Sequence, residues 1–302
     1  MKEIRDILIC GLGAIGGFYA AKIYDNSKYN LRVLIDINRL QRYMDSPRNI
    51  NGKNYIFDYV LPDDKSYKAD LIIISTKSSG LEWAISNIRN FVKEDSIILS
   101  FLNGISSEKE IAKVYGEDKV LYSFLLGHTF FREGNNVSHD GCADVYFGYP
   151  ENRNTERISR LRKCFDDLRI SYKLPDDILN SQWNKFCFNC CANQISAITG
   201  KTFSEMLKSE DCMQMIKGVA GEISQIAKAE GIAGSELFYE NVIKSFKLML
   251  PDGKTSMLQD IEADRSPETD IFGKVVLELG QKYGIDVPVN RKLYEMIMKK
   301  YN

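Results

Sequence analysis

A run of six residues, Gly11-Leu12-Gly13-Ala14-Ile15-Gly16, constrains the fold more than any other feature of the chain. It follows an apolar run at 7–10 and opens a stretch of helical periodicity at 14–24. In such a run the first glycine permits a tight turn, the second lets backbone approach a pyrophosphate, and the third lets the helix pack against the strand. The helix N-terminus then faces the negative charge. The run therefore predicts a dinucleotide-binding loop made by all six residues, and a tight turn without a ligand is the alternative.

Further apolar runs indicate a parallel sheet. Residues 31–35, 71–74 and 97–99 are almost continuously apolar, as strands covered on both faces should be. Helical periodicities lie between them, at 14–24 and 81–91, so strands and helices alternate. Strand signals continue at 120–126 and 145–147. We therefore expect an N-terminal α/β domain of the Rossmann type, with a parallel sheet, over residues 1–175.

The pattern of apolar residues changes near residue 175, where runs typical of strands stop. Five stretches of helical periodicity follow, at 178–198, 212–230, 236–250, 271–283 and 291–300. Gly231, Gly253 and Gly284 stand where helices should end. We expect a second, all-helical domain over residues 176–302.

Charge and cysteine usage limit the partners and the compartment. Lys plus Arg number 40 and Asp plus Glu 41, so a net charge of -1 gives no field that would gather nucleic acid or anionic lipid. The first apolar stretch is too short to span a membrane, and the acidic residues before it are atypical of a signal peptide. Seven cysteines in a chain of this size favour a reducing compartment. We expect a cytoplasmic protein without nucleic-acid or membrane partners.

Three of the cysteines have a spacing that a metal site could use. Cys187, Cys190 and Cys191 fall at helical i, i+3, i+4 positions. A zinc site needs four ligands, and the only histidines, His128 and His139, are distant in sequence. The expectation is therefore three packed thiols and no metal.

Asp36 follows the second predicted strand, about 20 residues after the glycine run. An acidic side chain there can accept both ribose hydroxyls of NAD and would repel the 2′-phosphate of NADP, so Asp36 favours NADH over NADPH. Arg39 could instead reach a 2′-phosphate, and Asp36 could simply cap the following turn.

Lys185, Asn189 and Asn193 lie four residues apart and therefore share one face of a predicted helix. Reduction of a ketone needs a donor to the oxygen that becomes an alkoxide, and a proton, and a lysine can supply both. Two amides beside it would bind a carboxylate or hydroxyls of a substrate, or else hydrogen-bond between helices. Lys77 and Asn103 follow strands, at the edge where open α/β sheets bind ligands.

Four segments, taken with the glycine run, resemble the ketopantoate reductase family over nearly the whole chain. They are Thr76-Lys77, Asn103-Gly104, Trp183-Asn184-Lys185 with Asn189 and Asn193, and Ser256 to Ile261 followed by Glu268. The resemblance implies a Rossmann domain followed by a helical domain of the 6-phosphogluconate dehydrogenase C-terminal type. It also implies reduction of a 2-oxo acid by NADPH or NADH, most specifically of 2-dehydropantoate to pantoate in pantothenate and coenzyme A biosynthesis.

The same resemblance implies residue roles. Lys185 matches the general acid, and Asn103 the residue that touches both nicotinamide and substrate. Lys77 would line the cofactor cleft, Ser256 would bind the substrate carboxylate, and Glu268 would contact the cofactor ribose. Asn189 and Asn193 would bind the substrate with Lys185.

Three positions depart from the family pattern. Many relatives have a basic residue in place of Asp36, an asparagine near Phe203, and an Asn-Gly pair at Gly273-Lys274. A phenylalanine cannot hydrogen-bond the hydroxyl end of ketopantoate, so a different branched or aromatic 2-oxo acid is an alternative substrate. A redox sensor that binds a dinucleotide without turnover is a second alternative. The sequence leaves the oligomeric state open, and a homodimer is compatible with it.

Overall fold

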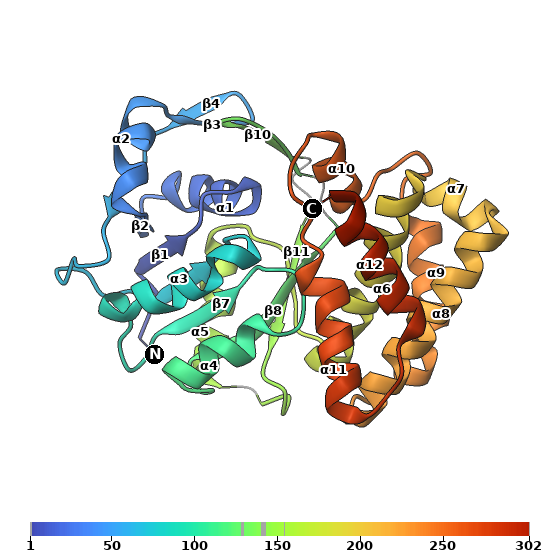
Figure 1. The fold of residues 1–302 in the computed structure, drawn as a ribbon. Coiled ribbons are helices and arrows are strands. Elements are labelled where there is room, and N and C mark those ends of the chain that lie inside the picture. Colours follow the sequence, from blue (N-terminus) through green and yellow to red (C-terminus); the bar gives the residue numbers. More distant parts are fainter. Residues whose placement is uncertain (1, 128–129, 140–142, 154, 302) are drawn as a thin grey trace. The chain divides into compact units, whose positions relative to one another are not determined.

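The computed structural model describes residues 2–127, 130–139, 143–153 and 155–301. Contacts within the chain divide it into two compact units, Met1–Ile178 and Leu179–Asn302 (Figure 1). The sequence pattern had placed this division near residue 175. The predicted fold class is confirmed, because the first unit is a mostly parallel sheet with helices and the second is helical.

An eight-stranded sheet forms the centre of the N-terminal unit, with strand order β12-β11-β8-β7-β6-β1-β2-β5. Its strands, in chain order, are β1 Asp6–Cys10, β2 Asn30–Leu34, β5 Tyr59–Val60, β6 Leu71–Ile74, β7 Ile97–Ser100, β8 Val120–Leu126, β11 Asp144–Gly148 and β12 Tyr172–Lys173. The strands from β8 to β5 run parallel, whereas β11 pairs antiparallel with β8. Two strands beyond the parallel part therefore extend the sheet at one edge.

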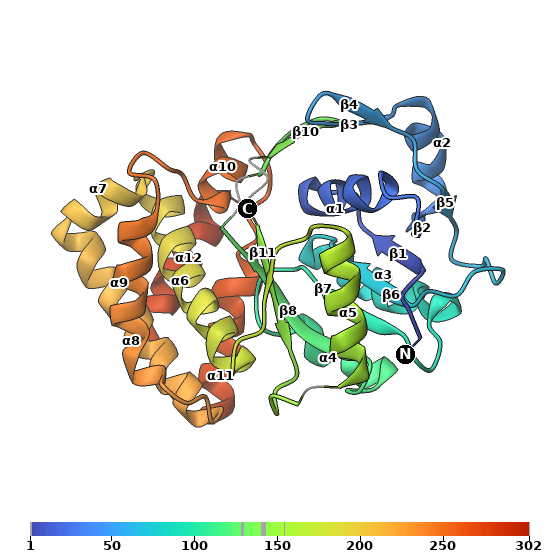
Figure 2. The same ribbon diagram turned by 180° about the vertical axis from the view of Figure 1, so that it is seen from behind.

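Helices cover both faces of this sheet, which explains why its central strands β1, β6 and β7 are almost continuously apolar. Ile7 and Ile9 belong to a core with helices α1, Ala14–Tyr24, and α5, Glu156–Asp167. Leu8 and Cys10 point into the core on the opposite face, with α3 and α4. These helices span Leu81–Asn87 and Ser107–Tyr115, and a short helix, α2, spans Ile37–Asp45. Figures 1 and 2 show α3 and α4 on one side of the sheet and α5 on the other.

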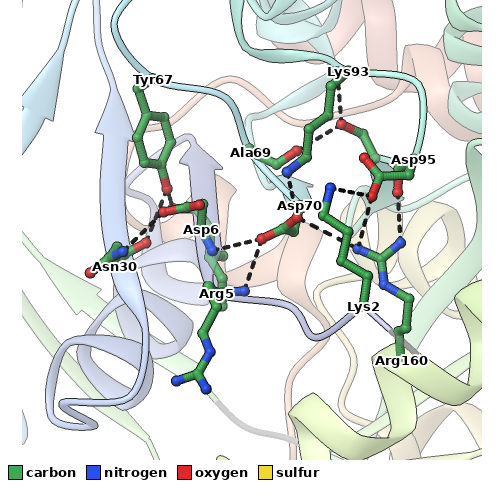
Figure 3. A network of polar contacts seen from close by, with 12 residues as sticks. Lys2, Arg5, Asp6, Asn30, Tyr67, Ala69, Asp70, Lys93, Asp95 and Arg160 are labelled. Carbon is green, nitrogen blue, oxygen red and sulfur yellow. Dashed lines mark hydrogen bonds and ion pairs between the residues drawn. The ribbon is translucent and has the colours of Figure 1, made fainter.

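A buried carboxylate joins the starts of β1 and β6. Asp70 is 2% exposed, and its Oδ2 accepts hydrogen bonds from the backbone N–H groups of Arg5, at 2.9 Å, and Asp6, at 3.0 Å. Its Oδ1 lies 2.5 Å from Lys93 Nζ and 3.5 Å from Arg160 Nη2 (Figure 3). Burial alone would raise the pKa of Asp70, but the hydrogen bonds from Asp6, Lys93 and Arg5 and the charge of Lys93 outweigh it and lower the pKa below its ordinary value.

A second, four-stranded sheet was not predicted. Its order is β4-β3-β10-β9, and its strands are β3 Arg48–Ile50, β4 Lys53–Tyr55, β9 Phe130–Glu133 and β10 Asn136–His139. β3 and β10 pair in parallel although they are far apart in sequence. Ile50 and Val137 pack against α1 at Gly17, where a Cβ would lie 3.6 and 4.0 Å from them. Strands this short and polar carry almost no local signal, so only tertiary packing defines them.

The C-terminal unit contains only helices among its described residues. They are α6 Ile178–Thr199, α7 Phe203–Lys208, α8 Glu210–Ala229, α9 Phe238–Leu248, α10 Ser256–Glu262, α11 Val275–Tyr283 and α12 Pro288–Tyr301, with a 3₁₀ turn at Ser235–Leu237 before α9 and a π-helical turn at Asp270–Lys274 before α11. The first residue of α6 falls in the N-terminal unit. Across the described part of the chain, no helix is both long and apolar enough to cross a membrane.

The predicted helical stretches are confirmed, with shifts at their ends. Helix α8 begins earlier than predicted because Ser209 caps it, accepting a hydrogen bond from Cys212 N. The predicted helix at 271–283 begins as the π-turn and continues as α11. α7 and α10 were missed, since helices of six or seven residues leave little periodicity to read.

Candidate cofactor and substrate sites

Two glycines of the loop are required by the fold itself. Gly11 has φ +108°, and a Cβ on it would lie 2.7 Å from Thr76 N. A Cβ on Gly16 would lie 1.9 Å from the carbonyl oxygen of Gly11 and 2.4 Å from Ser75 Oγ. Such contacts are far inside van der Waals distance, so only glycine fits where α1 crosses the ends of β1 and β6.

Gly13 is different, because nothing in the protein requires a glycine there. Its φ is −71°, and a Cβ on it would meet only the Ser75 carbonyl oxygen, at an ordinary 3.9 Å. Gly13 is the N-cap of α1, has no side-chain cap, and no acidic residue occupies the first turn of the helix. An uncapped helix N-terminus with open space over its backbone fits a pyrophosphate. Leu12 is buried, and Ala14 and Ile15 pack partly against the core, so these three support the loop.

Backbone hydrogen bonds bring three loops to one edge of the sheet. Ser75 N donates to Cys10 O, and Phe101 N donates to Ile74 O, both at 2.8 Å. The loops after β1, β6 and β7 therefore lie side by side at the carboxyl ends of their strands. Lys77, on the second of these loops, is exposed, and Asn103, on the third, is half-buried. The structure thus brings both residues to the edge that carries the glycine loop.

Asp36 caps helix α2. Its Oδ1 accepts a hydrogen bond from Asn38 N at 2.7 Å, and its carbonyl oxygen accepts one from Arg39 N at 2.9 Å. The capping alternative raised from the sequence therefore describes what the structure shows. Capping engages only one carboxylate oxygen, so the position after β2 remains suitable for a ribose contact. The Arg39 side chain is exposed on α2.

Helix α6 carries the predicted substrate face in the C-terminal unit. Lys185 and Asn189 are half-buried, whereas Asn193 is 4% exposed. Asn193 Oδ1 accepts hydrogen bonds from Ser256 Oγ at 3.2 Å and from Met257 N at 3.1 Å. The inter-helix alternative therefore holds for Asn193, which binds the first turn of α10. The same contact places Ser256 beside this face of α6, as expected if the two residues belong to one site.

Two residues that secure this contact were missed from the sequence. Ser196 Oγ lies 2.5 Å from Thr255 Oγ1, and Thr255 caps α10 by accepting from Leu258 N at 3.2 Å. A threonine directly before a helical stretch is a capping signal, but the helix was too short to be recognised. Glu268 is half-buried and lies between α10 and the π-turn.

The two other departures from the family pattern fill apolar or tightly packed positions. Phe203, 9% exposed, packs with Phe188 and Phe246, at ring-centroid distances of 6.2 and 5.7 Å. Gly273 lies in the π-turn, where a Cβ would be 2.7 Å from Gln194 Oε1. An aromatic cluster therefore occupies the Phe203 position, and a side chain at Gly273 would require the side chains of Gln194 and Tyr294 to shift.

Cys187, Cys190 and Cys191 are buried, as packed thiols should be. Burial raises the pKa values of Cys190 and Cys191 well above the ordinary value, so both are protonated near neutral pH. Among the described residues, no group of three or more His, Cys, Asp or Glu side chains could hold a metal ion. His128 lies outside the described residues, and the His139 backbone N–H donates to Asn51 Oδ1 in the small sheet.

An α/β unit with this glycine loop, followed by a helical unit that presents a lysine and amides on one helix face, defines the class of nicotinamide-dinucleotide oxidoreductases. Comparison with family models agrees with this class. The model described as ketopantoate reductase PanE/ApbA matches residues 7–152, and the model of its C-terminal domain matches residues 177–301. The chain belongs to the ketopantoate reductase family.

Three distant relatives align with almost the whole chain. The 2-dehydropantoate 2-reductase of Aquifex aeolicus is 23% identical, over 98% of this chain and 97% of its own. A solved structure of D-mandelate dehydrogenase with NADH and anilino(oxo)acetate is similar with a TM-score of 0.85 and 24% identity, over 98% of both chains. A dimeric ketopantoate reductase from Staphylococcus aureus is similar with a TM-score of 0.78 and 17% identity, over 98% of both chains.

Proposed function

We propose that this protein reduces a 2-oxo acid to a 2-hydroxy acid with NADH or NADPH, and that the substrate is 2-dehydropantoate, which gives pantoate for pantothenate and coenzyme A biosynthesis. The observation that carries the proposal is the contact between Asn193 and Ser256, which adds a hydroxyl to the Lys185 and Asn189 face of α6. Together these groups place the Lys185 cation and the amide N–H groups of Asn189 and Asn193 where they could donate to a carboxylate and an adjacent ketone, while Ser256 donates to Asn193 Oδ1 and so orients that amide. Membership of the family and the relatives named as 2-dehydropantoate 2-reductases support it.

The roles of the residues follow from this chemistry. Residues 11–16 bind the pyrophosphate, Asp36 the adenosine ribose and Lys77 the cofactor, while Glu268 contacts the cofactor ribose. Asn103 positions both nicotinamide and substrate, and Asn189, Asn193 and Ser256 hold the substrate. When bound, NAD(P)H supplies a hydride to the ketone carbon. Lys185 donates a hydrogen bond to the ketone oxygen and then gives it a proton, so that a neutral alcohol is formed.

Replacing Lys185 tests the proton donor. Lys185→Ala should lower kcat by roughly 10²–10⁴-fold, because general acid catalysis contributes about that much, and should leave the Kd for NADH almost unchanged. Lys217→Ala, which removes an exposed lysine from α8, is the matched control and should keep full activity. Near-normal turnover by Lys185→Ala would contradict the assigned role.

Asp36 can be tested apart from its capping function. Serine also caps helices well, so Asp36→Ser keeps the cap of α2 and removes only the charge. If Asp36 selects NADH, this variant should shift the ratio of kcat/KM for NADH over NADPH toward NADPH by about ten-fold or more, as relief of a charge repulsion of about 1.4 kcal/mol would do. An unchanged ratio would leave α2 capping as the only role of Asp36 and would point to Arg39 for cofactor choice.

A second candidate substrate is a branched or aromatic 2-oxo acid. The observation that favours it is Phe203, which joins Phe188 and Phe246 in an aromatic cluster and offers no hydrogen bond to a hydroxyl. The similar fold of D-mandelate dehydrogenase is consistent with such a substrate. Steady-state kinetics with ketopantoate, 2-oxoisovalerate and phenylglyoxylate decide between them, since the preferred substrate should have the highest kcat/KM. A clear preference for ketopantoate would remove this candidate.

The redox-sensor alternative, the oligomeric state and the location in the cell each have a test of their own. A redox sensor would bind NADH tightly and turn over none of these acids, so the same panel tests that alternative.

A homodimer, which the dimeric relative supports, would appear in light scattering as twice the 34.5 kDa chain mass. A cytoplasmic location, without nucleic-acid or membrane partners, remains a proposal that cell fractionation and pull-down can test.

A further inference from the structure

A buried polar chain lies beneath the loop that carries Asn103. Glu108, on the first turn of α4, is 1% exposed, and its Oε2 accepts a hydrogen bond from Ser107 Oγ at 2.9 Å. Ser107 Oγ lies 2.8 Å from Ser100 Oγ, at the end of β7. Glu108 Oε1 accepts from the backbone N–H of Ser123 in β8 at 3.3 Å. One carboxylate thus links α4 with the two strands beneath it.

The serines close this chain into a small network. Ser123 Oγ donates to the carbonyl oxygen of Ser100 at 2.9 Å and accepts from Ser100 N at 3.2 Å. Ser100 Oγ also accepts from Leu102 N at 3.4 Å. Ser100, Ser107 and Ser123 are 0 to 4% exposed, so the network is sealed from water. Hydrogen bonds in such surroundings are strong, and any that are broken are costly.

Capping of α4 alone does not require this arrangement. An acidic residue in the first turn stabilises a helix N-terminus from an exposed position, and Glu110 already does so. Burying a carboxylate costs several kcal/mol unless its hydrogen bonds repay it. The burial of Glu108 therefore calls for a role that an exposed acid could not fill.

The network joins both ends of one short loop. Residues 101–106 connect Ser100 to Ser107, and the loop contains Asn103 and Gly104, whose φ is +99°. Three residues of the loop are buried and anchor it in the core, namely Phe101, Leu102 and Ile105. Asn103 therefore lies in a fixed position at the sheet edge. That edge also carries the glycine loop, since β1, β6 and β7 are hydrogen-bonded in line at their carboxyl ends.

We propose that Glu108 is a positioning residue for the reductase reaction, which through Ser107 and Ser100 fixes the loop that presents Asn103 to the nicotinamide and substrate. The proposal rests on the function proposed above. Errors of about 1 Å in the position of a reacting group can lower turnover by about 10²-fold, so a loosened loop should reduce kcat more than cofactor affinity.

A double-mutant cycle on kcat tests this role. Glu108→Gln keeps the size of the side chain and removes its charge and one acceptor oxygen, and we expect kcat to fall about ten-fold while the Kd for NADH stays within about two-fold. If Glu108 acts through Asn103, the Glu108→Gln, Asn103→Ala double variant should be no slower than Asn103→Ala alone. Independent, multiplying effects of the two changes, or an unchanged kcat in Glu108→Gln, would overturn the proposal.

Glu110→Gln is the matched control, because it removes the same charge from the same helical turn at an exposed position and should change neither kcat nor the cycle. If Glu108→Gln does not fold, Ser107→Ala interrupts the same hydrogen-bonded chain with a smaller change and replaces it in the cycle.

Hydrogen exchange provides a measurement that needs no turnover. Peptides covering 101–106 should exchange faster in Glu108→Gln than in Glu110→Gln, and equal rates would reject the proposal. Wild-type protein inactive on every 2-oxo acid would refute the proposed function, and the exchange result would then decide the role of Glu108 in the loop.

Discussion

At the scale of single residues, Gly13 and Gly16 belong to one loop, but of the two only Gly16 must be glycine because of packing within the protein. Gly16→Ala would force a Cβ to within 1.9 Å of the Gly11 carbonyl oxygen, so backbone must move. We expect a loss of about 1–3 kcal/mol of stability, as is usual for overpacking. Gly13→Ala meets no such contact and should cost less than about 1 kcal/mol, the difference between glycine and alanine at an N-cap.

Relative to the stability that each variant loses, Gly13→Ala should weaken cofactor binding more than Gly16→Ala does. Gly13→Ala places a methyl group where a pyrophosphate would approach backbone, so the Kd for NADH should rise by at least about ten-fold in a protein of nearly unchanged melting temperature. Fluorescence titration and thermal unfolding measure the two quantities. A Gly13→Ala protein that binds NADH normally would mean that the loop is only a tight turn.

At the scale of elements, the first turn of α10 depends on Thr255. Thr255→Ala removes the cap at Leu258 and the bond to Ser196, and should destabilise α10 by about 1–2 kcal/mol. Because α10 holds Ser256 against Asn193, KM for the 2-oxo acid should rise as well. Thr155→Ala removes an equivalent cap, from α5 in the N-terminal unit, and should lower stability without changing KM. Equal KM values in both variants would show that α10 does not contribute to substrate binding.

Elements with strong local signals were predictable from the sequence, and those formed by distant contacts were not. The parallel strands were legible because burial on both faces makes 71–74 and 97–99 continuously apolar. β3 and β10 could not be predicted, since these paired strands are far apart in the sequence and contain few apolar residues. For the site, spacing alone placed Lys185, Asn189 and Asn193 on α6. The contact of Asn193 with Ser256, and the network around Glu108, depend on packing that no local pattern encodes.

At the scale of the whole molecule, resistance to acid should depend on Asp70. Its pKa is lowered in the folded protein, so the carboxylate contributes stability above the pKa of an unfolded aspartate, near 4, and this contribution is lost as pH falls through the lowered value. Asp70→Asn leaves Lys93 and Arg160 without their buried partner and should cost roughly 3 kcal/mol at pH 7.

The pH dependence of that difference is the decisive measurement. Unfolding free energies of wild type and Asp70→Asn, taken from urea titrations between pH 7 and pH 3, should differ by a constant amount down to about pH 4 and converge below it. Asp58→Asn is the control, since Asp58 pairs with Arg32 but its side chain is 69% exposed, and it should cost less than about 1 kcal/mol at every pH. A difference for Asp70→Asn that stayed constant to pH 3 would show that its hydrogen-bonding shape, rather than its charge, holds β1 and β6 together.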